Sequence, residues 1–231
     1  MPVIEVKELT KVYDETLVPV RALSGINLSF EKGEFTAIVG PSGCGKTTLL
    51  NLLGGLDRPT SGSVLVASED IGGMKAAALV DFRLHHIGFI FQSYNLIPVL
   101  TVKENVSFVM ELQRREKRAT EERVDYLLNA MGIADKKNVR PHYLSGGQQQ
   151  RVAVARALAP EPMFILADEP TANLDSKSTD HLLDLMSSLN RQEKVTFIFS
   201  THDQRVMDKA RRIVTLQDGV VIQDTDQSPA P

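Results

Sequence analysis

Short apolar runs recur along the chain and predict two groups of strands. The early runs are rich in β-branched and aromatic residues, and they predict an N-terminal sheet that precedes and flanks a glycine-rich loop. These runs are residues 4–9, 26–30, 35–39 and 64–66. The later runs are almost continuously apolar, as in strands buried on both faces, and they predict a parallel core sheet. These runs are residues 87–91, 163–167, 195–199 and 213–216.

The middle of the chain changes to the spacing of a helix. From Val124, apolar side chains recur at positions i, i+3, i+4 and i+7, and Gly132 supplies a C-terminal stop. This pattern predicts a helical lobe, about residues 93–160, inserted in an α/β core. We expect one domain over residues 1–224, followed by a disordered tail at 225–231 because that segment is polar and holds two prolines.

Composition limits the partners and the cellular compartment that we expect for the protein. The chain has 231 residues, 42% of them hydrophobic, and a formal net charge of -3, so no overall basic charge favours nucleic acid as a partner. Cys44 is the single cysteine, which suits a reducing compartment. No apolar stretch approaches the roughly 20 residues that span a bilayer, and charges come too early at the N-terminus for a signal peptide. We therefore expect a cytosolic protein that reaches a membrane only through a partner.

A phosphate-binding loop lies between a predicted strand and a predicted helix. Residues 40–47 fit the pattern G-x-x-x-x-G-K-[ST]. The glycines let the backbone curl so that amide groups point at phosphate oxygens, and the following helix presents its positive end to the same anion. Lys46 can reach the β- and γ-phosphates, and the Thr47 hydroxyl can bind Mg²⁺. An ordinary glycine-rich turn is the alternative, and the flanking elements favour a nucleoside triphosphate. The expected contact residues are Gly40, Pro41, Ser42, Gly43, Cys44, Gly45, Lys46, Thr47 and Thr48.

Two adjacent acids end one of the buried strands. Asp168 and Glu169 directly follow the apolar run that ends at Ala167, so they belong at a strand tip near the phosphate loop. There Asp168 can hold Mg²⁺, and Glu169 can polarise an attacking water as a general base. A strand that simply emerges into solvent at an acidic pair is the alternative.

A second candidate anion site opens a later helix. Ser145 and Gln148 fit a capping box before the helical run 152–158, but this alternative leaves Gly146 and Gly147 unexplained. Glycines in a first helical turn sacrifice up to roughly 1 kcal/mol each relative to alanine. A helix N-terminus without side-chain bulk can bind an anion. One nucleotide therefore has two candidate phosphate cradles.

The sequence Leu-Ser-Gly-Gly-Gln at residues 144–148 resembles the signature of the ATP-binding cassette (ABC) ATPases, and the resemblance runs over almost the whole chain. It implies a P-loop NTPase core with a parallel sheet, an N-terminal antiparallel β subdomain and an inserted α-helical subdomain. It also implies a head-to-tail homodimer in which each ATP lies between the phosphate loop of one subunit and Ser145, Gly146, Gly147 and Gln148 of the other. ATP and Mg²⁺ are the implied cofactors.

Four further positions take roles from the same resemblance. Tyr13 matches the aromatic residue that stacks on adenine, and Gln92 matches the glutamine that touches Mg²⁺ and water and senses the membrane partner. His202 matches the histidine that contacts the γ-phosphate and orients the catalytic water. Residues 172–175 resemble the loop that communicates between the two sites, with Asn173 where the family often has a small residue; we expect little effect from that difference.

Within the family, residues 54–62, 88–92 and 144–151 resemble the lipoprotein-releasing and macrolide-exporter branch. This implies an ATPase subunit that powers a separately encoded integral membrane permease and lies on the inner face of the cell membrane. A module for mechanical coupling, as in cell division, remains an alternative because it uses the same chemistry. A cassette acting on DNA or ribosomes is a third alternative, but the chain has neither a long coiled-coil or zinc insertion nor a second cassette.

Overall fold

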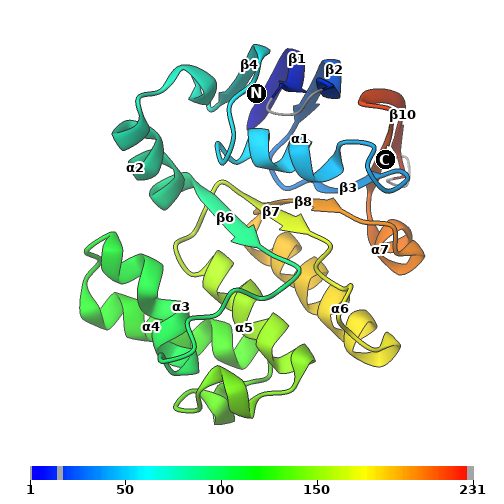
Figure 1. Ribbon diagram of the computed structural model, residues 1–231. Helices are drawn as coiled ribbons and strands as arrows, with labels where there is room; N and C mark the ends of the chain where they lie inside the picture. The colour runs from blue at the N-terminus through cyan, green and yellow to red at the C-terminus, as the bar shows by residue number, and fades with distance from the viewer. Residues whose placement is uncertain (1, 15–17, 228–231) are drawn as a thin grey trace.

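The computed structural model describes residues 2–14 and 18–227 and arranges them around two sheets (Figure 1). The larger sheet has the strand order β10-β9-β3-β8-β7-β6, and its strands are parallel except for β10, which pairs antiparallel with β9. Its strands are β3 (Phe35–Val39), β6 (Ile87–Ile90), β7 (Phe164–Asp168), β8 (Thr196–Ser200), β9 (Arg212–Gln217) and β10 (Val220–Asp226). The predicted parallel core is therefore confirmed.

Strand β3 corrects one sequence prediction. We expected residues 35–39 in the N-terminal sheet, whereas β3 lies between β8 and β9 at the centre of the parallel sheet. All its residues are buried, from Phe35 to Val39. A strand without polar alternation has both faces covered, and this is the condition of a parallel core strand.

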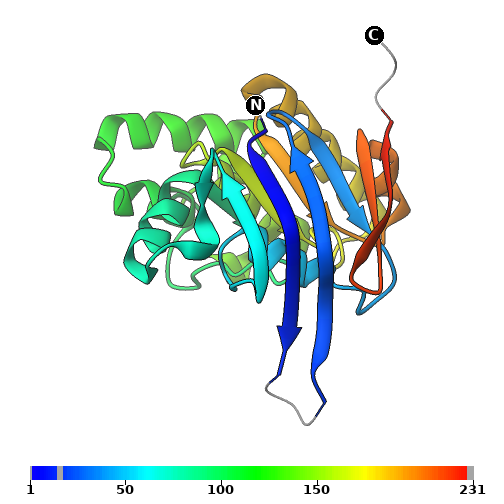
Figure 2. The same ribbon diagram turned by 90° about the horizontal axis from the view of Figure 1, so that it is seen from above.

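The smaller sheet is antiparallel, as the resemblance implied. Its order is β2-β1-β4-β5, and Figure 2 shows β1 and β2 running side by side as its longest strands. The strands are β1 (Ile4–Tyr13), β2 (Val20–Phe30), β4 (Ser61–Val66) and β5 (Glu69–Asp70). The early apolar runs other than 35–39 lie in this sheet.

Alternate residues of β7 face two different cores. Phe164 and Leu166 pack in the cluster formed with α1 and the antiparallel sheet, whereas Ile165 and Ala167 pack in the cluster formed with α5 and α6. Figure 1 shows the same division, with α1 on one side of the parallel sheet and α5 and α6 on the other. The period of the strand thus separates the molecule into two layers.

Helices cover both faces of the parallel sheet. Three of them, α3, α4 and α5, fall in the range expected for the inserted lobe; α4 buries Val124, Leu127 and Leu128, and Gly132 follows it with φ 63°. No helix among residues 2–14 and 18–227 combines the length and apolar character that a membrane crossing requires. The helices are α1 (Lys46–Leu53), α2 (Ala76–His86), α3 (Val102–Leu112), α4 (Lys117–Ala130), α5 (Gly146–Leu158), α6 (Ser176–Glu193) and α7 (Gln204–Lys209), with short 3₁₀ turns at Ile71–Gly73, Ala134–Lys136 and Pro141–Tyr143.

The expected tail begins later than the sequence suggested. Thr225 and Asp226 belong to β10, where they pair with Ile213 and Arg212 of β9. Backbone pairing with a neighbouring strand orders these polar residues although their side chains bury little apolar surface. Residues 228–231 lie outside the described part of the chain, and the domain limits stay a prediction.

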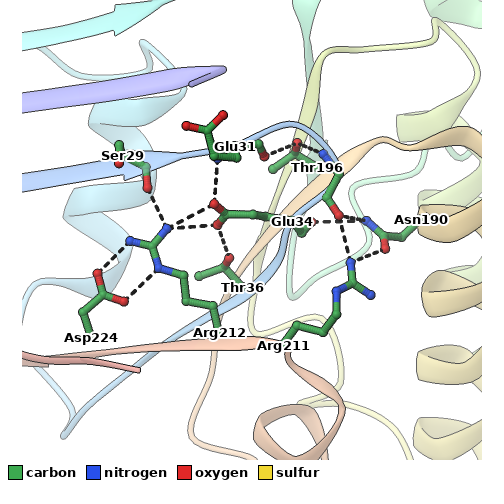
Figure 3. A network of polar contacts seen from close by, with 10 residues as sticks. Ser29, Glu31, Glu34, Thr36, Asn190, Thr196, Arg211, Arg212 and Asp224 are labelled. Atoms are coloured by element: carbon green, nitrogen blue, oxygen red, sulfur yellow. Dashed lines mark hydrogen bonds and ion pairs between the residues drawn. The ribbon is translucent and has the colours of Figure 1, made fainter. Parts of the chain in front are cut away.

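A polar network around Arg212 ties the two sheets together (Figure 3), and it includes Glu34, directly before β3, whereas the phosphate loop follows the other end of that strand. Arg212 makes a bidentate ion pair with Asp224, with N···O distances of 2.8 and 2.7 Å, and donates to Ser29 O and to Glu34. The Asp224 hydrogen bond raises the pKa of Arg212 above its ordinary value, against the opposing effect of burial. Its guanidinium therefore connects β9, β10, β2 and the turn before β3 through one cation.

We expect Arg212→Met to lower the free energy of unfolding by about 2 kcal/mol, because it leaves Glu34 and Asp224 without their cation. The side chain of Arg212 is 18% exposed, so we expect less than the loss seen for fully buried pairs. Arg118→Met is the matched control, since the Arg118 and Glu122 side chains are 83% and 65% exposed. Urea denaturation of both variants measures the difference, and equal losses would contradict the assigned role of the network.

Candidate functional site

The phosphate loop has the backbone that glycine permits. Gly40, Gly43 and Gly45 have φ angles of 149°, 79° and 104°. A Cβ on Gly40 would lie 2.0 Å from Leu216 O, and a Cβ on Gly45 would lie 2.5 Å from Ala22 O. The loop is therefore pressed against β9 and β2, and α1 begins within the pattern, at Lys46, directly after its N-cap Gly45. The unpaired amide groups of the first turn of α1 consequently lie at this loop.

Lys46 curves back over the phosphate loop. Its Nζ donates to Gly40 O at 2.8 Å and to Pro41 O at 2.9 Å. Ser42 is exposed, whereas Cys44 is 3% exposed and its Sγ lies 4.0 Å from the Lys46 Nζ. The loop therefore presents its backbone and one ammonium group to any anion that enters, as the sequence pattern predicts.

Two oxygen-bearing side chains meet beside the loop. Thr47 Oγ1 lies 3.2 Å from each carboxylate oxygen of Asp168. Asp168 also accepts a hydrogen bond from Ser200 Oγ, a contact that the sequence did not indicate. Residues 2–14 and 18–227 contain no group of three or more His, Cys, Asp or Glu side chains with metal-binding geometry. A hydroxyl and one carboxylate nevertheless suit Mg²⁺, which keeps water and phosphate oxygens as its other ligands.

Glu169 and His202 form a direct pair. The Glu169 Oε1 and the His202 Nδ1 lie 2.8 Å apart; the glutamate side chain is 17% exposed and the histidine 74%. Adjacent parallel strands explain the meeting, because Asp168 of β7 pairs in register with Ser200 of β8. Glu169 has φ 46°, a left-handed conformation, and its amide donates to Ser200 O at 3.0 Å. The backbone is thus held in a conformation that costs about 1–3 kcal/mol and that occurs often in active sites.

Gln92 lies on the neighbouring strand end. It follows β6, which pairs with β7, and its backbone carbonyl accepts a hydrogen bond from the Asn173 Nδ2 at 2.8 Å. Gln92 is exposed. The carboxyl ends of β6, β7 and β8 therefore place Gln92, the Asp168–Glu169 pair and His202 on one edge of the sheet.

Tyr13 lies at the end of β1 in the antiparallel sheet. Its hydroxyl donates to Asp57 Oδ2 at 2.8 Å, and the Lys11 Nζ lies 4.7 Å from its ring centroid. Burial and the bond to Asp57 raise the pKa of Tyr13. Burial alone would raise the pKa of Asp57, but hydrogen bonds from Lys11 and Tyr13 lower it. One face of the ring therefore carries a cation, and the hydroxyl is fixed by a carboxylate.

The signature residues make the capping box that the sequence offered as an alternative. Ser145 caps α5 by accepting from the Gln148 amide at 3.3 Å, and the Gln148 Oε1 accepts from the Ser145 amide at 2.9 Å. A Cβ on Gly146 would lie 2.8 Å from the Tyr94 Oη, and one on Gly147 would lie 3.2 Å from the Ser178 Oγ. A side chain at 146 would therefore have to displace the Tyr94 hydroxyl.

The residues expected around the phosphate loop lie together, whereas the signature residues at the start of α5 lie apart from them. The carboxyl ends of the core strands adjoin all the residues of the first group, which are Lys46, Thr47, Asp168, Glu169 and His202. By contrast, Tyr94 and Ser178 border the N-terminus of α5 on the layer away from α1. Two further polar residues lie in this region: Arg156 was not assigned a role from the sequence, and Asn173 was placed in the communicating loop with little effect expected from its side chain. Arg156 interrupts the apolar run 152–158, which was the available signal.

Comparisons with known proteins find similar proteins that match most of this chain. A family profile described as "ABC transporter" matches residues 23–172. The chain is 46% identical over 207 residues to the lipoprotein-releasing system ATP-binding protein LolD 1 of Rhodopseudomonas palustris, which covers 89% of this chain and 92% of the relative. It is 43% identical to the macrolide export ATP-binding/permease protein MacB of Hyphomonas neptunium, over 99% of this chain and 35% of that longer protein.

A solved structure shares the fold. The chain superposes with a TM-score of 0.89 and 38% identity on a dimeric structure of a post-hydrolysis state of the ATP-binding cassette MJ0796, which is bound to ADP and Pi. The match covers 98% of this chain and 100% of that chain. The similarity therefore includes the sheets, the helical segment and the loops that carry the site.

Proposed function

The chain belongs to the ABC transporter family as an ATP-binding, ATP-hydrolysing subunit, and from this we propose that two copies complete each ATP site. The observation that carries the proposal is the separation of the two cradles. Lys46 lies on the α1 layer, whereas Ser145 opens α5 on the other layer. A second subunit related by a two-fold axis can bring its Ser145 to the phosphate loop of the first. The dimeric state of the similar cassette supports this arrangement.

We propose that the side chains around Lys46 divide the work of phosphoryl transfer. The Lys46 ammonium and the α1 N-terminus stabilise negative charge on the transferring group. Glu169 accepts the proton of the attacking water, and His202, at 2.8 Å, orients that carboxylate and the water. Thr47 and Asp168 would hold Mg²⁺, which supplies further charge neutralisation when bound. Gln92 would stand beside the metal and the water at the edge of β6.

Tyr13 offers a test of nucleotide binding. Since Lys11 covers one face of the ring, we propose that adenine stacks on the other. Tyr13→Ala should raise the Kd for ATP about tenfold, because a base-aromatic stack is lost. Tyr13→Phe keeps the ring and loses only the bond to Asp57, so its Kd should stay within about threefold of wild type. Calorimetric titration distinguishes the two, and equal weakening would assign Tyr13 a structural role instead.

We further propose that the subunit powers a separately encoded membrane permease of the lipoprotein-release or macrolide-export type. The LolD and MacB relatives support this branch. Co-purification from membranes tests it: an integral membrane protein should accompany the tagged chain, and the complex should move a substrate. A membrane partner without a transported substrate would favour mechanical coupling, and recovery with DNA or ribosomes alone would overturn the proposal.

A further inference from the structure

The loop that carries Gln92 has a backbone that requires support. Tyr94 and Asn95 have φ angles of 59° and 49°. The turn is closed by short-range bonds, from the Tyr94 amide to Phe91 O at 3.2 Å and from the Asn95 amide to Ser93 O at 2.6 Å. Consecutive left-handed residues other than glycine persist only where the surrounding structure holds them. The contacts of this loop therefore decide where Gln92 lies.

The signature helix α5 holds the far side of this loop. Arg156 of α5 donates from Nη2 to Tyr94 O at 2.9 Å and from Nη1 to Asn95 O. The Tyr94 hydroxyl lies against Gly146 in the first turn of the same helix. The carbonyl groups of both left-handed residues are thus bound by one guanidinium, whose charge strengthens the hydrogen bonds.

Asn173 binds the start of this loop, at Gln92. Its Nδ2 donates to Gln92 O at 2.8 Å, across 81 residues of sequence. A backbone carbonyl only accepts, so the amide nitrogen must face it. Asn173 lies in a turn that starts at Glu169, because the Ala172 amide donates to Glu169 O at 3.2 Å. One side chain therefore connects the Gln92 backbone to the turn that begins at the proposed general base.

We propose that Asn173 is a positioning residue that keeps Gln92 beside Asp168 and Glu169 and thereby sets the turnover rate. This inference rests on the proposed role of Gln92 in the site. A small residue such as alanine at position 173 has no group that can reach the carbonyl, so the difference from which we expected little effect adds a contact in the structure. The side chain of Asn173 donates to Gln92 O, whereas its backbone carbonyl is the part that borders Gly146, so we expect removal of the side-chain amide to change turnover rather than nucleotide binding.

Steady-state kinetics test this separation. Asn173→Ala should lower kcat about three- to tenfold, the effect of losing one hydrogen bond to a positioned loop, with KM for ATP unchanged. Asn129→Ala is the matched control: it removes an amide-to-carbonyl bond of 2.7 Å, to Asp125 O on α4, and should leave both constants at wild-type values. A rise in KM with unchanged kcat, or wild-type values for Asn173→Ala, would overturn the proposal.

A double-mutant cycle shows whether Asn173 acts through Gln92. Gln92→Ala should lower kcat, and adding Asn173→Ala should lower it no further, because the positioned group is already gone. Additive losses would overturn the proposal. A wild-type kcat for Gln92→Ala would instead refute the proposed catalytic role of Gln92, and with it the link from Asn173 to turnover.

Amide hydrogen exchange measures the stability of the loop that carries Gln92 and does not depend on catalysis. In Asn173→Ala, amides of the peptide covering residues 92–97 should exchange faster than in wild type, whereas Asn129→Ala should leave them unchanged. Unchanged exchange in Asn173→Ala would show that Asn173 does not hold the loop, even if the ATPase site is otherwise as proposed. This measurement therefore separates a failure of the inference from a failure of the proposed function.

Discussion

Glu169→Gln should lower kcat by at least about a hundredfold, because a positioned general base contributes about 10²–10⁴ to the rate. The amide keeps the size of the carboxylate but cannot accept the proton of the attacking water. The Kd for ATP should stay within about threefold of wild type, since the phosphate loop and Tyr13 are unaltered. Single-turnover hydrolysis and nucleotide binding measure the two effects separately.

The same variant should accumulate dimers. If ATP joins two subunits and hydrolysis releases them, a subunit that binds without hydrolysing will remain paired, and light scattering will detect a dimer with ATP and a monomer with ADP. Glu161→Gln is the control, because Glu161 pairs at 2.7 Å with Arg115 away from the site. A wild-type rate for Glu169→Gln would show that another group is the base.

Ser145→Arg should reduce hydrolysis to near background, because an arginine at the N-cap of α5 occupies the face that the partner's nucleotide must approach. The lost cap also costs about 1 kcal/mol of stability. Thr101→Arg places the same bulk at the N-cap of α3, which has an equivalent capping box with Glu104, and should retain activity. Equal inactivation of both variants would point to a folding defect rather than to a blocked site.

Mixing subunits makes the test specific. Lys46→Ala subunits lack the cation of the phosphate loop and should be inactive alone. In an equal mixture with Ser145→Arg subunits, half of the dimers are mixed and each has one intact composite site, so about a quarter of wild-type activity should return. If the mixture stays inactive at concentrations that dimerise wild type, the site is not shared between subunits.

The grouping of residues around the phosphate loop could be predicted from the sequence because its parts are local. The glycines, Lys46 and Thr47 fall within eight consecutive positions between an apolar strand and a helix, and the acids directly end another apolar strand. Such patterns can be recognised in the sequence without knowing which strands are neighbours in the sheet. The later apolar runs likewise identified four strands of the core sheet, β6, β7, β8 and β9, since burial on both faces leaves a continuous apolar signal.

What the sequence did not predict depends on distant partners. Periodicity shows that residues 35–39 form a strand but not that β8 and β9 flank it, so their sheet was assigned wrongly. The bond between Asn173 and Gln92 joins residues with no sequence relation, and Asn173 alone resembles any polar loop residue. The amphipathic signal of α2 is weak, because Leu79 and Phe82 are its only buried residues, and the helix was not predicted.

The registration of β7 against β8 makes chain length at this point part of the chemistry. Because adjacent residues of a strand point to opposite faces, one extra residue within β7 would move Asp168 to the place of Glu169, and one residue fewer would move Glu169 to the place of Asp168. Either change would also turn Ile165 and Ala167 away from the α5 and α6 layer. Surface loops generally tolerate changes of length, whereas a change of length within the five residues of β7 would displace both the proposed metal ligand and the proposed proton acceptor.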